Sequence, residues 1–326
     1  MKLGKCLGFL PVFGGLLHKM YRVDTVQGAY AVKLLNPEIM KRDSAWDHYL
    51  FSEQIAGLAK EQGIPALPAL NQDGLPIQKI EDHCFMVFPW FEGIADVTGA
   101  PDPGKAAKIG ACLAKIHQIK GMGVCSSKPE TYAAKDWEQA KVLGTGQGKA
   151  WMDSYICFLP QIQEIERNII QTEPELFENR IVSHRDLDRK NVLWDAKGNP
   201  MLIDWEAAGW IHPSLDVVST ALYWSVDETM RWFPQCFQAF LQAYAKTSPA
   251  FEFPCWKAAL YGDLAGKLDW LFYNLCRSVG MVSADLQEQQ IAEEQIVKTL
   301  HEIQKEVLLF DRLRQDLNQY LRKEMN

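Results

Sequence analysis

The sequence predicts an α+β protein in two parts, a small lobe of strands around one helix followed by a larger lobe built mainly of helices. Two observations support this fold class. Before Gly93, β-rich runs alternate with one helical pattern, whereas long helical patterns dominate after it. A single compact β-rich segment between Ile181 and Ile203 interrupts the helical part. We therefore expect a lobe of residues 1–92 and a lobe of residues 93–326.

The small lobe is predicted to begin with a β-hairpin. Met20 to Val26 and Ala29 to Leu35 are β-rich runs, and the Gln-Gly pair between them suits a tight turn. Apolar residues recur at helical spacing from Ser44 to Gln62, and Gly63 marks the end of that helix. Cys84 to Phe88 has the short apolar pattern of a buried strand.

The large lobe is predicted to have helices before and after its β-rich segment in the chain. Helical spacing covers Lys105 to Ile119, Trp151 to Asn168 and Met230 to Lys246. The charged tail from Asp285 to Lys323 predicts one further helix. Three short strands are expected inside the β-rich segment, at Ile181 to His184, Val192 to Trp194 and Met201 to Ile203.

Composition limits the class of protein. The chain has 326 residues and a formal charge of −7, with 48% hydrophobic and 23% charged residues. This balance is typical of a folded soluble protein and excludes a disordered chain or a collagen-like fibre. The acidic surplus argues against nucleic acid as a partner, because phosphate backbones attract basic surfaces.

The cysteines and the N-terminal segment predict a cytoplasmic protein. None of the eight cysteines stands in a C-x-x-C pair, so neither a zinc ribbon nor a thioredoxin-like site is supported. The apolar stretch from Cys6 to Leu17 is similar to the core of a signal peptide, but Gly and Pro interrupt it and no small-residue cleavage site follows. No uncharged apolar run is long enough to span a membrane.

The residues with the clearest chemical meaning lie in the β-rich segment. His184-Arg185-Asp186 and Asn191 fit the kinase catalytic-loop pattern H-R-D-x-x-x-x-N, and a short β-run then ends at Asp204. Phosphoryl transfer needs a carboxylate that orients the acceptor hydroxyl, which Asp186 would provide. It also needs oxygen ligands for Mg²⁺, which Asn191 and Asp204 would supply. The alternative interpretation is that these are ordinary turn residues.

Two features nearer the N-terminus fit the same chemistry. Ala29 to Lys33 has the pattern of the strand that carries a phosphate-binding lysine, and Glu53 lies in the next helix, where an ion-pair partner is expected. Taken alone, such a lysine is usually exposed at a strand edge, and such a glutamate is usually solvated. Gly14 and Gly15 provide a flexible turn whose backbone N–H groups could approach phosphates.

These motifs resemble the aminoglycoside phosphotransferase and choline kinase-like family, and the resemblance extends from Gly14 to Asp216. It implies a bilobal protein-kinase-like fold. By this resemblance Asp186 is the catalytic carboxylate, Asn191 and Asp204 bind Mg²⁺, and Lys33 pairs with Glu53 and with the phosphates of ATP. The resemblance also places Phe88 beside the adenine, with the Pro89 carbonyl and the Phe91 amide at its edge.

The chain departs from the family pattern at several positions. Arg185 replaces the usual Gly, and Asp188-Arg189-Lys190 replaces His-Pro-Gly. Trp205-Glu206 after Asp204 is similar to the choline-kinase branch. No A-P-E segment follows, and the chain soon reaches Asp216, which argues against a protein substrate.

The acceptor pocket is expected in the Trp-rich segment of the large lobe. An aromatic cage with carboxylates such as Asp227, Asp263 or Asp269 would suit an amine or a quaternary ammonium group. The alternative is that most of these aromatic residues form helix-packing core. The set comprises Tyr223, Trp224, Trp232, Phe233, Phe237, Trp256, Tyr261, Trp270, Phe272 and Tyr273.

The sequence therefore predicts a kinase that uses ATP, or alternatively GTP, with Mg²⁺ to phosphorylate a hydroxyl group of a small molecule. An amine-containing acceptor, like an aminoglycoside, choline or an amino alcohol, is one alternative, and the sequence does not name the acceptor. We expect neither nucleic acid nor membrane as a partner, and a monomer or homodimer. An antibiotic-inactivating role, a metabolic role, and a nucleotide-binding pseudokinase that acts as sensor or scaffold remain alternatives.

Overall fold

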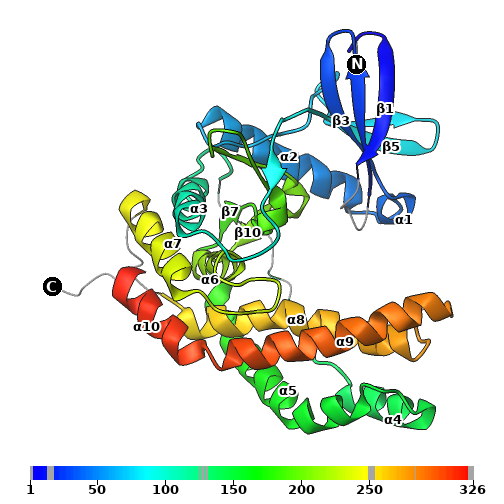
Figure 1. The fold of residues 1–326 in the computed structure, drawn as a ribbon, viewed down its shortest axis with the longest axis vertical. Helices are drawn as coiled ribbons and strands as arrows, with labels where there is room; N and C mark the ends of the chain where they lie inside the picture. The colour runs from blue at the N-terminus through cyan, green and yellow to red at the C-terminus, as the bar shows by residue number, and fades with distance from the viewer. Residues whose placement is uncertain are drawn as a thin grey trace.

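The fold combines an N-terminal antiparallel sheet with a mainly helical C-terminal part, as predicted (Figure 1). Figure 1 shows the sheet at the top of the molecule and helices α4 (Trp137–Gln147) and α5 (Met152–Thr172) at the bottom. Helices α8 (Trp256–Ser278) and α9 (Leu286–Val307) cross above them, and β7 (Ile181–Ser183), β10 (Gly209–Ile211) and α6 (Pro213–Tyr223) lie between these helices and the sheet. The computed structural model describes residues 3–12, 18–123, 125, 129, 131–248, 254–282 and 284–321. No helix within these ranges is long and apolar enough to cross a membrane.

The sheet of the N-terminal part has five strands in the order β1-β2-β3-β5-β4. The predicted hairpin is formed by β2 and β3, although its turn falls on Val26 and Gln27, one residue earlier than expected. Strand β1 was not predicted, because Gly8 and Pro11 interrupt its apolar pattern. The strands are β1 (Cys6–Val12), β2 (Lys19–Thr25), β3 (Gly28–Leu34), β4 (Ile77–Ile80) and β5 (His83–Pro89).

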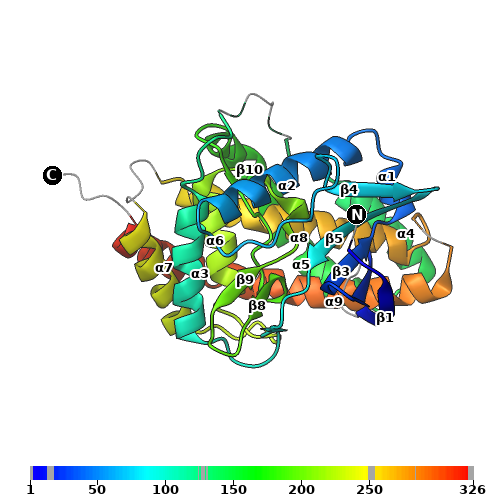
Figure 2. The same cartoon turned by 90° about the horizontal axis from the view of Figure 1, so that it is seen from above.

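Helix α2 (Ala45–Glu61) forms close to the predicted position and follows the one-turn helix α1 (Pro37–Met40). One face of α2 is buried and carries Tyr49, Glu53 and Ile55. Figure 2, a view from above, shows α2 passing over α6 and β10, and α2 also contacts the short 3₁₀ helix η3 (Trp205–Ala207). This helix therefore carries Glu53 between the sheet and the β-rich segment.

The helical part has a core in which α3 and α7 pack closely together. Gly110 makes this approach possible, because a Cβ atom there would lie 2.3 Å from the carbonyl oxygen of Phe240. Helices α6 and α10 contact this pair, whereas α4, α5 and α9 pack around α8. The helices of this part are α3 (Pro103–Ile116), α4 (Trp137–Gln147), α5 (Met152–Thr172), α6 (Pro213–Tyr223), α7 (Pro234–Thr247), α8 (Trp256–Ser278), α9 (Leu286–Val307) and α10 (Phe310–Leu321).

The prediction of a single helix for the tail was wrong. The chain breaks into α9 and α10 at Leu308, whose side chain is exposed. Ile296 and Ile303 of α9 pack into a cluster with α5 and α8, whereas Leu313 and Leu317 of α10 pack into the main core with α3 and α7. A straight helix could not reach both clusters, so burial of both apolar faces favours the turn.

The β-rich segment forms two small sheets, which position the predicted catalytic loop. Strand β7 pairs with β10, and β8 pairs with both β6 and β9. The turn between β8 and β9 uses Gly198 at φ 74° and Asp195, whose carboxylate accepts the backbone N–H of Asn199. The strands are β6 (Ile94–Ala95), β7 (Ile181–Ser183), β8 (Val192–Trp194), β9 (Pro200–Leu202) and β10 (Gly209–Ile211), with the 3₁₀ helices η1 (Glu173–Leu176) and η2 (Arg189–Asn191) nearby.

Candidate active site

The loop between β7 and β8 brings Asp186 and Asn191 into direct contact. The side-chain amide of Asn191 donates to the Asp186 carbonyl at 2.8 Å and to its carboxylate Oδ2 at 2.9 Å. The Asp186 side chain retains about a third of its surface exposed, at 34%. The catalytic-loop spacing thus produces an oriented carboxylate that solvent or a ligand can reach.

His184 anchors the start of this loop. Its Nε2 donates to the Ile203 carbonyl at 3.0 Å, and its Nδ1 accepts the backbone N–H of Asp186 at 3.4 Å. Burial lowers the pKa of His184, so the ring is neutral and can fill both roles. These two contacts give His184 a structural role in the loop.

Asp204 is brought to the same place by the backbone that follows β9. The Ile203 N–H donates to the Asn191 carbonyl at 3.0 Å, which holds this backbone beside the catalytic loop. Asp204 adopts a left-handed conformation with φ 60°, as does Arg185 with φ 66°. Left-handed backbone at non-glycine residues is costly and is concentrated at functional sites. The two predicted metal ligands, Asn191 and Asp204, therefore lie on adjoining segments.

Lys33 reaches this site from the N-terminal sheet. Its ammonium group lies 2.7 Å from the Asp204 carboxylate and 2.5 Å from the Glu206 carboxylate. Burial alone would lower the pKa of Lys33, but the two carboxylates outweigh burial and raise it. Strand β3 and the segment after β9 are thus joined by one cation between two acids.

The expected ion pair between Lys33 and Glu53 is not formed. Lys33 pairs with Asp204 and Glu206, while Glu53 accepts the backbone N–H of Ala69 at 2.7 Å. Burial raises the pKa of Glu53 to about 7, although the Ala69 hydrogen bond and the charge of Lys33 oppose the rise. The ammonium group of Lys33 is therefore bound by the partly exposed carboxylates of Asp204 and Glu206, and not by the buried carboxylate of Glu53.

Glu206 is a site residue whose role the sequence left open, and it is held by His18. The Nδ1 of His18 accepts the Asn36 N–H at 3.0 Å, so its proton lies on Nε2, 3.3 Å from Glu206 and 3.0 Å from the Tyr49 hydroxyl. Burial opposes ionisation of Glu206, but His18 and Lys33 outweigh it and lower its pKa to about 2. His18 stands in no motif, so nothing in the sequence marks it as a site residue.

The segment expected at the adenine edge continues β5. The Trp90 N–H donates to the Ala29 carbonyl at 3.1 Å, so Pro89 and Tyr30 form a non-hydrogen-bonded pair in the antiparallel ladder. The Pro89 carbonyl therefore points away from β3. Phe91 lies beyond the strand and close to Gly93, where a Cβ atom would lie 2.6 Å from the Phe91 ring. Phe88 is half-buried beside the cluster under the sheet.

A buried arginine fixes the catalytic loop to the chain that links β6 with α3. The guanidinium group of Arg189 donates to the carbonyls of Asp96 at 2.7 Å, Gly99 at 3.1 Å and Thr98 at 3.2 Å. It also lies 3.5 Å from the Asp96 carboxylate. The family pattern has Pro at this position. That departure was the only sequence signal for the contacts that Arg189 makes.

Comparisons with known proteins identify the family of this chain. A sequence model of the phosphotransferase enzyme family matches residues 9–250 of the chain. The chain belongs to the phosphotransferase enzyme family. Its fold is similar to that of spectinomycin phosphotransferase in complex with ADP and spectinomycin, with a TM-score of 0.69, 11% identity, and coverage of 95% of this chain and 94% of that one.

Two further relatives broaden the comparison. The fold is also similar to that of choline kinase from Cryptosporidium parvum, with a TM-score of 0.55 and 14% identity. The alignment covers 96% of this chain and 93% of the choline kinase chain. A protein of Enterococcus faecium described as a probable ketoamine kinase is 22% identical over 215 residues, which are 60% of this chain and 68% of that protein. All three relatives are described as kinases or phosphotransferases of small molecules.

The carboxylates proposed for an amine cage already have partners in this phosphotransferase. Asp269 lies 2.7 Å from the ammonium of Lys135, Asp263 binds Lys267, and Asp227 accepts hydrogen bonds within its own loop. Most of the ten aromatic residues are buried or partly buried in the core, which supports the interpretation that they form helix-packing core. Within this set only Trp270 and Tyr273 are exposed, and their rings stack with centroids 5.6 Å apart. An amine cage made from these acids is therefore not preformed.

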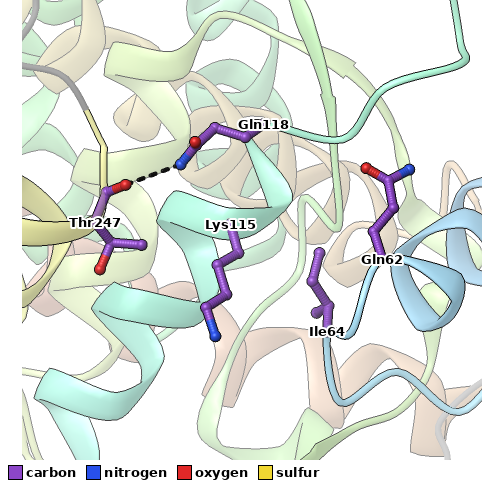
Figure 3. A pocket seen from close by; sticks show the side chains of 5 residues that line it. All are labelled: Gln62, Ile64, Lys115, Gln118 and Thr247. Carbon is purple, nitrogen blue, oxygen red and sulfur yellow. Dashed lines mark hydrogen bonds between the residues drawn. The ribbon is translucent and has the colours of Figure 1, made fainter.

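A pocket of about 210 Å³ is lined by none of the candidate site residues described above (Figure 3). Gln62, Ile64, Lys115, Gln118 and Thr247 line it, at the ends of α2, α3 and α7. The side chain of Gln118 donates to the Thr247 carbonyl at 3.0 Å, and Gln62 exchanges hydrogen bonds with Lys120. Its polar groups serve the packing of helix ends, so we assign it no catalytic role. Gly14 and Gly15 lie outside the described residues.

Proposed function

We propose that this protein transfers the γ-phosphoryl group of ATP to a hydroxyl group of a small molecule. The observation that carries the proposal is the convergence of Lys33, from the N-terminal sheet, with Asp204 beside the hydrogen-bonded pair of Asp186 and Asn191. This arrangement combines a cation for phosphates, oxygen ligands for a hard metal ion and a carboxylate for the acceptor. A sensor without catalysis has no comparable support.

The residues would divide the chemistry between them. Asp186 accepts the proton of the acceptor hydroxyl as its oxygen bonds to the γ-phosphorus, while the bond to the β–γ bridging oxygen breaks and ADP leaves with that electron pair. Asn191 and Asp204 offer oxygen ligands, which fit Mg²⁺, and the bound ion would neutralise phosphate charge. Lys33 would move from its acids to the phosphates.

The nucleotide would be bound by the N-terminal lobe, which we propose spans residues 1–92 and is followed by a catalytic and acceptor-binding lobe of residues 93–326. Phe88 would border the base, and the Pro89 carbonyl and Phe91 amide would face its edge. Gly14 and Gly15 would bring backbone N–H groups to the phosphates. The carbonyl acceptor suits the amino group of adenine, which favours ATP over GTP.

The acceptor would be a small hydroxyl compound that contains an amine, since the named relatives act on such compounds: a ketoamine kinase, a spectinomycin phosphotransferase and a choline kinase. Neither nucleic acid nor a membrane is part of this proposal, and the protein would act as a cytoplasmic monomer or homodimer. Resistance to an antibiotic and a metabolic role differ only in the identity of this acceptor.

Replacement of the proposed catalytic carboxylate tests the function. Asp186→Asn should lower the rate of phosphate transfer from ATP by about 10²- to 10⁴-fold, because proton transfer is lost while the shape is kept. The measurement is transfer of labelled phosphate to a panel of aminoglycosides, choline-like amines, amino alcohols and ketoamines, together with binding of ATP. Asp153→Asn, an exposed change on α5, is the matched control. Full activity of Asp186→Asn would overturn the proposal.

A further inference from the structure

The catalytic loop carries a lysine whose backbone is fixed on both sides. Lys190 stands between Arg189, which donates to three backbone carbonyls, and Asn191, which donates twice to Asp186. Both neighbours are buried, while the Lys190 side chain is 57% exposed. The loop therefore presents this one side chain at a defined place beside the reacting carboxylate.

The ammonium group of Lys190 lies between two acids. It is 3.6 Å from Oδ2 of Asp186 and 3.6 Å from Oδ2 of Asp188. Both distances exceed normal hydrogen-bond length, so among the described residues the ammonium keeps its N–H donors available for another acceptor. Without this cation, two carboxylates would face any anion that approached Asp186, and like charges repel.

We propose that Lys190 is a further catalytic residue, whose ammonium group binds the γ-phosphoryl group during its transfer. This inference rests on the proposed function. The hydroxyl oxygen that gives its proton to Asp186 is the oxygen that bonds to the γ-phosphorus, so the phosphoryl oxygens pass within reach of a cation beside that carboxylate. An ammonium is a compact donor for anionic phosphate oxygens.

Lys190 and Lys33 would then approach the triphosphate from opposite lobes. Lys33 comes from β3 and is buried with its two acids, whereas Lys190 comes from the catalytic loop and is exposed. Lys33 would serve phosphates that stay with the nucleotide. Lys190 would serve the phosphate that leaves it, and for that reason its contribution should depend on the presence of a γ-phosphate.

The test compares binding of Mg²⁺-ADP with binding of the non-hydrolysable Mg²⁺-AMP-PNP by calorimetry. Lys190→Gln should weaken AMP-PNP binding by about 10- to 100-fold, since a charge-assisted contact is lost, and leave ADP binding within about twofold. Lys190→Arg should restore most of the AMP-PNP affinity, because the cation returns. Lys197→Gln, an exposed lysine in the turn between β8 and β9, should change neither affinity.

Each other outcome overturns a defined part of the account. Equal weakening of both nucleotides would make Lys190 a structural residue, and unchanged AMP-PNP binding would make it an ordinary surface lysine paired with Asp186. A change confined to the Michaelis constant of the acceptor would assign it to acceptor binding instead. Failure of the unaltered protein to bind either nucleotide would overturn the proposed function itself.

Discussion

Two lysines in this protein are each held by two carboxylates, one at the candidate active site and one inside the helical lobe. At the site, Lys33 pairs with Asp204 and Glu206, whose side chains are 36% and 26% exposed. Lys33 and Asp204 are 171 positions apart in the sequence. The pairing links the N-terminal sheet to the segment after β9, and the acids remain within reach of another cation.

In the helical lobe, Lys267 binds Asp263 one turn earlier on α8 and Glu306 on α9, the latter at 2.8 Å. The side chains of these acids are only 6% and 2% exposed. Burial and the neighbouring Asp263 raise the pKa of Glu306 to about 8, against the opposing charge of Lys267. At neutral pH the two acids of this cluster therefore hold one proton between them, and the cluster with Lys267 has no net charge.

The comparison shows that the two clusters differ in the exposure of their acids and in the additional contact of Glu206 with His18. Glu206 has a pKa of about 2 and is ionised, whereas Glu306 has a pKa of about 8 and is protonated. Charged acids that solvent reaches can exchange one cation for another. A sealed and neutral cluster holds helices together, since a charge left alone there would be costly.

Removal of the lysine in the sealed cluster should have the largest effect on stability. Lys267→Met should lower the free energy of unfolding by about 3–5 kcal/mol, because it leaves buried acids without their cation. Urea denaturation measures this change, and Lys298→Met on the exposed side of α9 is the control, with an expected change below about 0.5 kcal/mol. A loss for Lys267→Met as small as that of the control would show that the cluster does not stabilise the lobe.

The protonated state of Glu306 predicts a smaller effect that depends on pH. Its folded pKa of about 8 lies above its usual value of 4.5, so the folded state binds more protons than the unfolded state between these values. Stability from this group is therefore full below about pH 4.5 and is lost as pH rises towards 8. Each proton contributes about 1.4 kcal/mol per pH unit.

Glu306→Gln should flatten this dependence, since its amide cannot titrate. Between pH 5.5 and 7.5 the stability of Glu306→Gln should rise relative to the unaltered protein by about 1–3 kcal/mol. Denaturation at several pH values measures the difference, and Glu294→Gln, an exposed change on the same helix, is the control. Parallel pH curves for Glu306→Gln and the unaltered protein would contradict a pKa near 8.

The sequence predicted the elements whose signal is local. The hairpin of β2 and β3, helix α2 and the strands around the catalytic loop follow from apolar spacing and turn residues. The spacing of Asp186 and Asn191 also predicted their approach, because a short loop between two strands brings them together. In each case the deciding contacts lie within a few residues in the chain.

Contacts between segments that lie far apart in the chain could not be predicted from the sequence. The pairing of Lys33 with Glu206 in place of Glu53 depends on how the lobes meet, and no local pattern encodes that. The break at Leu308 depends on two separate apolar clusters, and the partners of Asp263 depend on the packing of α8 against α9. The proposed roles of the site residues and the boundary at Gly93 stay predictions.

Matched changes in the two clusters test the central claim most directly. Asp204→Asn and Asp263→Asn each remove the charge of one of the two acids that hold a lysine. Phosphate transfer from ATP and urea denaturation are measured for both variants. Asp204→Asn should lower transfer by about 10²-fold or more, with stability within about 1 kcal/mol, since its acid serves the reaction. Asp263→Asn should lose stability yet transfer phosphate normally while folded. The reverse result, with transfer intact in Asp204→Asn and lost in folded Asp263→Asn, would contradict the assignment of the active site.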